Sequence, residues 1–492
     1  MTEKDAFQWC QVSPERYERD ADTPEQFYNT IVRIFKTTGH IFFAIVAVLE
    51  FSLEDNSIDD VVITNAFRYA WRRLRYQFPT IASQVVYDTA TKTCRKVYQV
   101  IKKDDEMNDW LDSTITVELG TRTAQEYANE DTPLGDYASL HVFKAESVHD
   151  TNGVKWSLLF RSHHDVVDGL GTFKILNHLF TFAAEYLSNP STIQSVRFGD
   201  EISQLSPPLQ VQAKITKPTE KQLAKLNAQK ELNDQNRAEL PILCYPGEVT
   251  APKSGRSQQI TTKLSMESSD RIIKACKVYG ITPTHLFHAA IGLALRDLQP
   301  RSDKDELKRY MTYALVDLRK TCPDSENHPA SVLHTVSTNH LVLDLIVPAA
   351  SETPVTTSQE ELLSTVNTVR DYYKSIIIDQ DFLAVVPTVM APPQFSEDHP
   401  PIPIPAGNRT VSLSSLGLID AVFKPNHGLL HIHSPSVIGA EYGTGLGVFL
   451  GTFAGEIHVW AGYNEAFHEE TDVKEYLDLV CKNALLIVDA MK

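Results

Sequence analysis

The chain has 492 residues, of which 42% are hydrophobic, so it can bury a large interior, and its length indicates two subdomains of roughly 200 residues each. Its formal net charge of −17 argues against a nucleic-acid or anionic membrane surface, because both need a concentrated excess of lysine and arginine. A small-molecule partner is therefore expected.

Segments that would direct the chain into a membrane or out of the cell are not expected. The longest apolar run, 41–49, has nine residues, whereas a membrane-spanning helix needs about 20. The first ten residues have neither the basic nor the apolar region of a secretory signal. The six cysteines are scattered without CxxC spacing, which is typical of free thiols in a reducing compartment, so the cytoplasm is expected.

The first half of the chain contains strands and helices in alternation. Residues 43–53 have the mostly apolar pattern of a buried strand, and apolar side chains recur at helical spacing over 63–78, before Pro79 ends the helix. A further apolar strand is predicted over 154–162, and a helix follows over about 170–183. The short segment that joins these last two elements is rich in histidine, aspartate and glycine.

A polar connector, residues 206–243, separates a first half, 1–205, from a second half, 244–492. It carries few large apolar side chains and is predicted to be partly helical. The proline-rich stretch 391–407 is predicted to be an exposed loop or strap. The other predicted elements of the second half are a helix at 284–298, strands at 311–319 and 410–419, a hairpin-like pair at 447–464 and a last helix at about 469–490.

The joining segment of the first half, RSHHDVVDGLG at 161–171, carries the strongest functional signal. A histidine followed four positions later by aspartate occurs about once by chance in a chain of this length. Here it occurs three times, starting at His164, His340 and His468. Only the first match extends to HHxxxDG, which is roughly a thousandfold rarer. A histidine has an ordinary pKa near 6.5 and can take a proton from an alcohol or amine, so His164 is the candidate general base.

With this motif the sequence resembles the CoA-dependent acyltransferase superfamily built on the chloramphenicol-acetyltransferase fold, which includes peptide-synthetase condensation domains, plant alcohol acyltransferases and fungal trichothecene O-acetyltransferases. The resemblance implies an α/β (α+β) fold of two subdomains, each a mixed sheet with helices, with the active-site channel between them. It implies that His164 is the general base and that Asp168 pairs with an arginine. It also implies that Gly169 leaves room beside the channel and that His163 is a structural neighbour.

Two segments of the second half resemble the same superfamily. The stretch ALVDLRK resembles the strand whose arginine pairs with the motif aspartate, which assigns Arg319 to Asp168. The stretch VSLSSLG resembles the strand beside the catalytic histidine, and it makes Ser414 and Ser415 the candidate oxyanion donors. These two side chains would face opposite sides of a regular strand, so at most one of them is expected to have this role.

The pattern favours the fungal trichothecene 15-O-acetyltransferase type. The plant branch is disfavoured because its second signature, DFGWG, is absent, and the nearest stretch is EYGTGLG at 441–447. The resemblance implies direct transfer of an acyl group from acyl-CoA (acetyl-CoA) to a hydroxyl of a secondary metabolite, in a ternary complex without an acyl-enzyme. Acyl-CoA is then a co-substrate, and no permanently bound cofactor or metal is implied.

Two other functions remain open for the same motif. A stand-alone condensation-like enzyme would form an amide or ester from an acyl group that a carrier protein holds. A non-catalytic or cyclase relative would keep the fold and transfer no acyl group. Free CoA thioesters would saturate a CoA-dependent transferase, whereas a condensation-like enzyme would need a phosphopantetheinylated carrier protein.

Other features receive no catalytic role. The histidines His427, His431 and His433 have no cysteine or carboxylate nearby in sequence that would complete a metal site, so a surface or interface strand is predicted. The basic stretch 95–103 is predicted to be a solvated strand edge, with contact to CoA phosphates as the alternative. A chain with both halves resembles the monomeric branch of the superfamily, so a monomer is expected.

Overall fold

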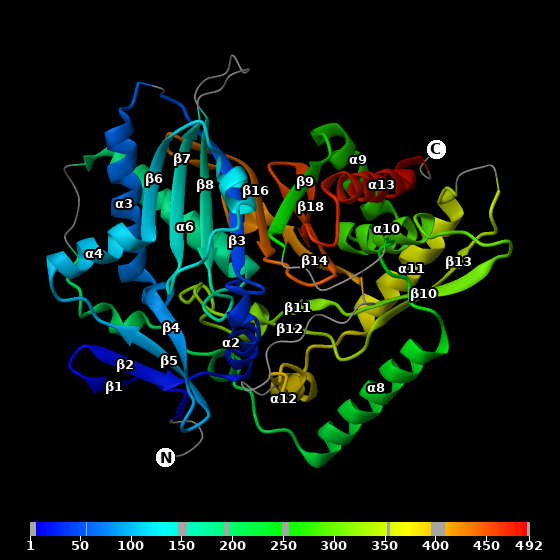
Figure 1. Cartoon of the computed structure of the whole chain (residues 1–492), viewed down its shortest axis with the longest axis horizontal. Coiled ribbons are helices and arrows are strands. Elements are labelled where there is room, and N and C mark those ends of the chain that lie inside the picture. Colours follow the sequence, from blue (N-terminus) through cyan, green and yellow to red (C-terminus); the bar gives the residue numbers. More distant parts are fainter. Residues whose placement is uncertain are drawn as a thin grey trace.

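The computed structural model has two main β-sheets side by side, each with helices packed on it (Figure 1). Two separate hydrophobic cores are centred on these sheets. The mixed α/β (α+β) fold of two subdomains is therefore confirmed. The structure describes residues 6–55, 57–145, 155–190, 196–247, 255–351, 355–394 and 409–489.

The first sheet has six strands and belongs mainly to the first half of the chain. Its elements are β3 (Ile45–Leu53), β6 (Ile115–Gly120), β7 (Ser139–Ala145), β8 (Lys155–Ser162), β15 (Asn426–His427) and β16 (Leu430–Gly439), with helices α3 (Asp60–Gln77), α4 (Asp104–Thr114), α5 (Ala124–Asn129) and α6 (Gly169–Ser188). The strand order is β15-β16-β3-β8-β7-β6. Strand β3 pairs antiparallel with both β8 and β16. Because β15 and β16 lie beyond residue 244, the last part of the chain returns to this sheet.

Helix α3 shows how the sequence fixes the ends of an element. The Asp59 side chain accepts a hydrogen bond from the backbone N–H of Val61 and so caps the first turn. The helix ends at Gln77, just before Pro79. The helix packs against α6, and its apolar face is part of the first core.

The second sheet has four strands and belongs to the second half of the chain. Its elements are β9 (Ser257–Lys263), β14 (Val411–Leu418), β17 (Leu446–Phe453) and β18 (Glu456–Asn464), with helices α9 (Met266–Val278), α10 (Pro283–Asp297), α11 (Gln359–Ser375) and α13 (Glu470–Asp489) nearby. The order is β14-β17-β18-β9, and β14 runs parallel to β17. Helix α10 packs against both α11 and α13, and all its residues from Leu286 to Arg296 are buried.

Smaller sheets and helices complete the fold around the two main sheets. These are β1 (Cys10–Ser13), β2 (Arg16–Asp20), β4 (Ser83–Asp88), β5 (Thr93–Gln99), β10 (Glu306–Thr312), β11 (Leu315–Asp317), β12 (His334–Val336), β13 (Leu341–Val347), α2 (Thr23–Phe35), α7 (Leu209–Gln212), α8 (Glu220–Glu239), α12 (Gln380–Val389) and 3-10 turns at Lys36–Thr38, Pro79–Ala82, Glu201–Gln204, Arg319–Thr321 and Ile419–Ala421. Strand β10 pairs with β13, and β11 pairs with β12. Strand β5 lies between β2 and β4. The prediction of a solvated edge at 95–103 is therefore wrong, and Lys96 within it is fully buried.

One other predicted element differs from the structure. The single strand predicted at 311–319 is wrong: it is divided between β10 and β11, which belong to different sheets. The backbone N–H of Ala314 donates to the hydroxyls of Ser337 and Tyr372, both at 3.0 Å, and this interrupts the ladder. The connector, predicted to be partly helical, contains α7 and α8. Helix α8 begins at a capping box of Thr219 and Gln222. Most of the predicted strap at 391–407 lies outside the described residues.

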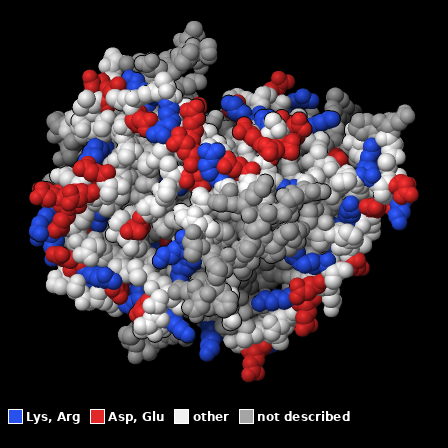
Figure 2. Space-filling view, in the orientation of Figure 1, with Lys and Arg blue, Asp and Glu red and all other residues white. Residues whose placement is uncertain are grey.

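Acidic and basic side chains are interspersed over the face shown in Figure 2, where their described members form small clusters of mixed sign. A surface of this kind gives no continuous positive field for a polyanion. Within the described ranges, no helix is both long and apolar enough to cross a bilayer.

Candidate active site

The HHxxxDG segment forms a tight turn between β8 and α6. The backbone N–H of Val166 donates to the carbonyl of His163 at 3.1 Å and closes the turn. Asp168 caps α6, since its Oδ1 accepts a hydrogen bond from the backbone N–H of Gly171 at 2.8 Å. His163 and His164 point to different partners, and the ring of His163 contacts the carbonyl of Gly135 at 3.0 Å. The local sequence thus leaves His164 at the end of a buried strand, beside a helix start.

His164 is half-buried in a mainly aromatic environment. Its ring is stacked on that of Tyr28, with centroids 3.8 Å apart and planes inclined by 7°. Burial, together with the neighbouring His334, lowers the pKa of His164 to about 3, although the carbonyls of His164 and Val167 act in the opposite direction. The imidazole is therefore uncharged at neutral pH. Its Nδ1 is buried and makes no hydrogen bond of normal geometry to the described residues.

Asp168 is the centre of a buried ion pair. Its Oδ1 lies 2.6 Å from Nη2 of Arg319, and its Oδ2 accepts a hydrogen bond from the backbone N–H of Leu333 at 2.8 Å. Nδ1 of His334 is 3.5 Å from the same Oδ2. Burial alone would raise the pKa of Asp168, but Arg319 and His334 hold it well below its usual range. No hydrogen bond joins Asp168 to His164 in the described part of the chain, so the aspartate does not orient the histidine directly. It links the start of α6 to Arg319 and to the backbone of Leu333.

A second histidine links Asp168 to the aromatic wall of the site. Nε2 of His334 is 2.8 Å from the hydroxyl of Tyr28, and the ring centroids of His164 and His334 are 5.4 Å apart. The contacts run from Asp168 through His334 to Tyr28, whose ring covers His164. This arrangement fixes the position of the His164 ring from one side.

A buried cluster of charged side chains, Arg19, Glu25 and Lys96, packs against the HHxxxDG turn. Nζ of Lys96 donates to the carbonyl of Asp165 at 2.5 Å and to Oε1 of Glu25 at 2.8 Å. Arg19 forms a bidentate pair with the same carboxylate, at 2.7 and 2.6 Å. Burial would raise the pKa of Glu25, but Arg19 and Lys96 lower it to about 2, so the cluster is charged. Lys96 therefore clamps the backbone next to His164.

A cavity of about 350 Å³ opens beside His164, between the two subdomains. Its wall is mainly apolar and includes Tyr28, Ile45, Leu315, Val336, Leu413, Leu416, Ile438 and Phe449. A Cβ on Gly169 would lie 3.2 Å from Leu416 and 3.7 Å from Val437, both of which border the cavity, so the glycine leaves room at this wall. The predicted serines, Ser414 and Ser415, also border it.

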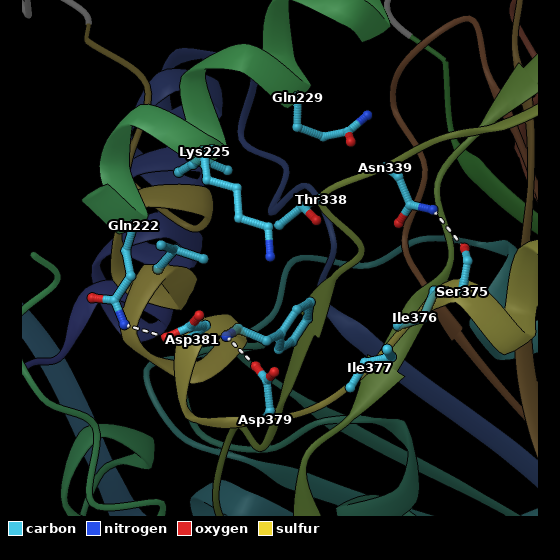
Figure 3. Close-up of a pocket in the computed structure, with 13 residues that line it drawn as sticks. Gln222, Lys225, Gln229, Thr338, Asn339, Ser375, Ile376, Ile377, Asp379 and Asp381 are labelled. Carbon is cyan, nitrogen blue, oxygen red and sulfur yellow. Dashed lines mark hydrogen bonds between the residues drawn. The ribbon is translucent and has the colours of Figure 1, made fainter. Parts of the chain in front are cut away.

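A second cavity of about 350 Å³ lies between α8 and α12 (Figure 3). Its polar groups are largely paired with one another: Gln222 donates to Asp381 at 2.7 Å, and Asn339 donates to Ser375 at 2.9 Å. Figure 3 shows Lys225 reaching toward the open space from α8. Its walls contain neither histidine nor cysteine, and the histidine of the HHxxxDG motif borders the other cavity.

The three histidines for which no metal site was predicted, His427, His431 and His433, each contact a nearby polar group of the protein. His427 contacts the carbonyl of Lys424 at 3.1 Å, His431 contacts Asn426 at 2.7 Å, and Nε2 of His433 is 2.9 Å from Ser52. Over the described residues, no group of three or more histidine, cysteine, aspartate or glutamate side chains is arranged to hold a metal ion.

Comparison with known proteins identifies the family. The model of the family described as 15-O-acetyltransferase Tri3 matches residues 7–386, most of the chain. The chain belongs to the Tri3 15-O-acetyltransferase family. The resemblance to the chloramphenicol-acetyltransferase-like superfamily is thereby confirmed.

Relatives of this Tri3-family chain agree in fold. Trichothecene 15-O-acetyltransferase TRI3 of Fusarium sporotrichioides is 25% identical over 276 residues, or 52% of this chain and 51% of that protein. The chain thus spans about half the length of the curated relative that it matches. The solved structure of that enzyme superposes with a TM-score of 0.79 at 19% identity, covering 98% of both chains. The first condensation domain of the calcium-dependent antibiotic synthetase gives 0.63 at 14% identity, covering 96% of each.

The site of this Tri3-family member contains three residues that sequence reasoning missed: Tyr28, His334 and Lys96. Tyr28 and His334 are 306 positions apart, and no motif marks either of them. Lys96 lies in a basic stretch whose composition suggested a surface. The structure places Asp168 against Arg319 and both serines at the cavity, while it turns His163 away toward Gly135.

Proposed function

We propose that the chain is an acyl-CoA-dependent O-acetyltransferase that acetylates a hydroxyl of a secondary metabolite, with His164 as the general base. The observation that carries this proposal is the surroundings of His164. In a chain of the 15-O-acetyltransferase family, the uncharged imidazole of the HHxxxDG turn borders the cavity between the two subdomains. The mainly apolar wall of that cavity suits a hydrophobic alcohol.

In the proposed reaction, His164 takes the proton of the acceptor hydroxyl while the hydroxyl oxygen attacks the carbonyl carbon of acetyl-CoA. The tetrahedral adduct then collapses, the carbon–sulfur bond breaks, and His164 returns the proton to the leaving thiolate. The products are an acetate ester and free CoA, and no acyl-enzyme forms. Because Nδ1 is buried, we assign the proton transfer to Nε2.

Ser414 is our candidate for the donor that stabilises the oxyanion of the adduct. The hydroxyl of Ser415 is engaged with Oγ1 of Thr284 at 2.8 Å. Ser414 forms no side-chain hydrogen bond to the described residues, and its position at the cavity wall leaves its hydroxyl for a substrate. Donors of this kind contribute about 3 to 4 kcal/mol to transition-state stabilisation.

The substrates, compartment and assembly state complete the proposal. The relative's name supports a trichothecene-type alcohol as the acceptor class, and acetyl-CoA is a co-substrate that the protein does not retain. None of the six cysteines, all of which lie in the described ranges, forms a disulfide, which suits a reducing compartment, and we therefore propose the cytoplasm. Both halves of a single chain border the cavity, which supports a monomeric enzyme.

Thiol release from acetyl-CoA tests the proposed reaction. With purified protein and a panel of trichothecene and other polyhydroxylated terpenoid alcohols, we expect release that depends on the alcohol and equals the amount of acetate ester found by mass spectrometry. Release without an alcohol, measured in parallel, gives the hydrolysis control. If no CoA thioester serves and an acyl group on a phosphopantetheinylated carrier protein does, the enzyme is condensation-like.

The pH dependence of kcat/KM is expected to be flat between pH 5.5 and 7. The pKa of His164 is lowered to about 3, so the neutral base persists as the pH falls through this range. A solvated histidine base with a pKa near 6.5 would instead lose about tenfold at pH 5.5. Circular dichroism at each pH controls for unfolding. An inflection near pH 6.5 in the folded protein would mean that the ring is solvated.

A further inference from the structure

The catalytic cavity has a further polar side chain, Glu441, which follows a strand of the first sheet at the same end of the strands as His164. In the first sheet, Gly439 of β16 pairs with Ile45 of β3, and Ile45 pairs with Ser162 of β8. Glu441 lies two residues after Gly439, and His164 lies two residues after Ser162. Both side chains border the cavity. Because β16 and β8 are separated by β3, the two backbones leave the sheet about two strand spacings, or roughly 10 Å, apart.

The carboxyl of Glu441 lacks the partners that other acidic groups of the cavity have. Asp168 and Asp317 share Arg319, whereas Glu441 forms no ion pair with the described residues. Its Oε1 accepts a hydrogen bond from the backbone N–H of Gly443 at 2.6 Å. Burial raises the pKa of Glu441 to about 8, and the Gly443 hydrogen bond opposes this only in part. At neutral pH the group is therefore largely a carboxylic acid, able to donate as well as accept.

A tyrosine hydroxyl lies within electrostatic reach of this carboxyl. Tyr313, in the break between β10 and β11, borders the same cavity. Burial raises the pKa of its phenol, and the charge of Glu441 raises it further. Tyr313 in turn contributes to the raised pKa of Tyr28, whose ring covers His164. The hydroxyl of Tyr313 makes no hydrogen bond to any described residue, and Glu441 uses only one of its oxygens for Gly443. The mainly apolar cavity therefore contains two further polar groups whose hydrogen-bonding capacity is not fully used.

We propose that Tyr313 and Glu441 form a polar subsite that binds a second hydroxyl of the acceptor, one that is not acetylated. This inference rests on the proposed function. Tyr313 is 38% exposed and Glu441 is half-buried, and both border the cavity. A substrate hydroxyl both donates and accepts hydrogen bonds, as the pair requires. A phosphate of CoA suits the position less well than a hydroxyl, because neither Tyr313 nor Glu441 carries a positive charge. The subsite would select acceptors with two hydroxyls at a set separation over compounds with one.

The test compares a trichothecene triol with its mono-deoxy analogues, each of which lacks one hydroxyl other than the acetylated one. Dissociation constants are measured by calorimetry in a His164→Ala background without acetyl-CoA, so that no turnover occurs, and KM and kcat are measured with His164 present. We expect Tyr313→Phe and Glu441→Leu to weaken triol binding about tenfold, with a matching rise in KM and kcat within about twofold. The one analogue that lacks the recognised hydroxyl should bind wild type and variants alike.

Two further variants make the result specific. Glu441→Gln keeps an acceptor for Gly443 and a hydrogen-bonding head, so it should restore most of the triol affinity that Glu441→Leu loses. Tyr186→Phe, on α6, removes a tyrosine hydroxyl outside the cavity and should change no dissociation constant. Tyr313→Phe decides the question if Glu441→Leu fails to fold.

Several results would overturn the subsite. They are an unchanged triol affinity in Tyr313→Phe, an equal loss for the triol and every analogue, and no binding of the triol to the unmodified cavity. Failure of the proposed function is distinguishable, because wild type would then bind the triol with the same dependence on Tyr313 and transfer no acetyl group to it.

Discussion

Replacing His164 by alanine is expected to lower kcat/KM for acetyl transfer by about 10² to 10⁴. The imidazole is the uncharged base that borders the cavity. Water in the vacated space would be a far weaker base, and the stacked ring of Tyr28 carries no group that accepts a proton at neutral pH, since burial raises its pKa well above the ordinary value. Thiol release over a range of acceptor concentrations, together with the dissociation constant for acetyl-CoA, measures the loss.

The neighbouring histidine supplies the matched control for this variant. His163 belongs to the same motif, but its ring contacts the carbonyl of Gly135. His163→Ala is therefore expected to lose much less activity than His164→Ala while removing an identical set of atoms. Equal losses in the two variants would indicate general damage to the turn. If His164→Ala kept the wild-type rate, His164 would have no catalytic role and HHxxxDG would be only a structural turn in this protein.

The local part of the site could be predicted because its residues are contiguous. The strand expected at 154–162 is β8, at Lys155–Ser162, and the helix after the turn begins at the residue that Asp168 caps. An apolar strand, a short polar turn and a capped amphipathic helix each leave a periodic signal in the sequence. The position of His164 between them followed from these signals alone.

The rest of the site depends on contacts that a single sequence does not encode in its spacing. Tyr28 comes from α2 and His334 from β12, and only the packing of the two subdomains brings their side chains together. Lys96 looked exposed because basic residues surround it, yet β5 is an interior strand and its ammonium group is neutralised by Glu25. The break at Ala314 was hidden because residues on both sides keep an alternating pattern, while the side-chain hydroxyls that interrupt the ladder come from distant segments.

Replacing Asp168 by asparagine is expected to destabilise the protein by about 3 to 5 kcal/mol, because Arg319 would remain buried without its main counter-charge. At about 2 °C or more per kcal/mol for a folding unit of this size, the midpoint of thermal unfolding should fall by about 6 °C or more. Activity should fall as well, since the carboxylate also binds the backbone of Leu333 and the first turn of α6. Differential scanning calorimetry and thiol release on the folded fraction measure the two effects separately.

Two further variants distinguish a structural aspartate from a catalytic one. Asp317 bonds the same arginine at 2.8 Å but is 40% exposed, so Asp317→Asn should cost no more than about 1 kcal/mol. In the double variant Asp168→Asn with Arg319→Met, no unpaired charge remains buried, and much of the lost stability should return. If Asp168 acted directly on His164, Asp168→Asn would be as stable as the wild type and inactive, and the second substitution would restore nothing. The contacts of Asp168 with Arg319, Leu333, Gly171 and His334, and the lack of a described bond to His164, favour the first outcome.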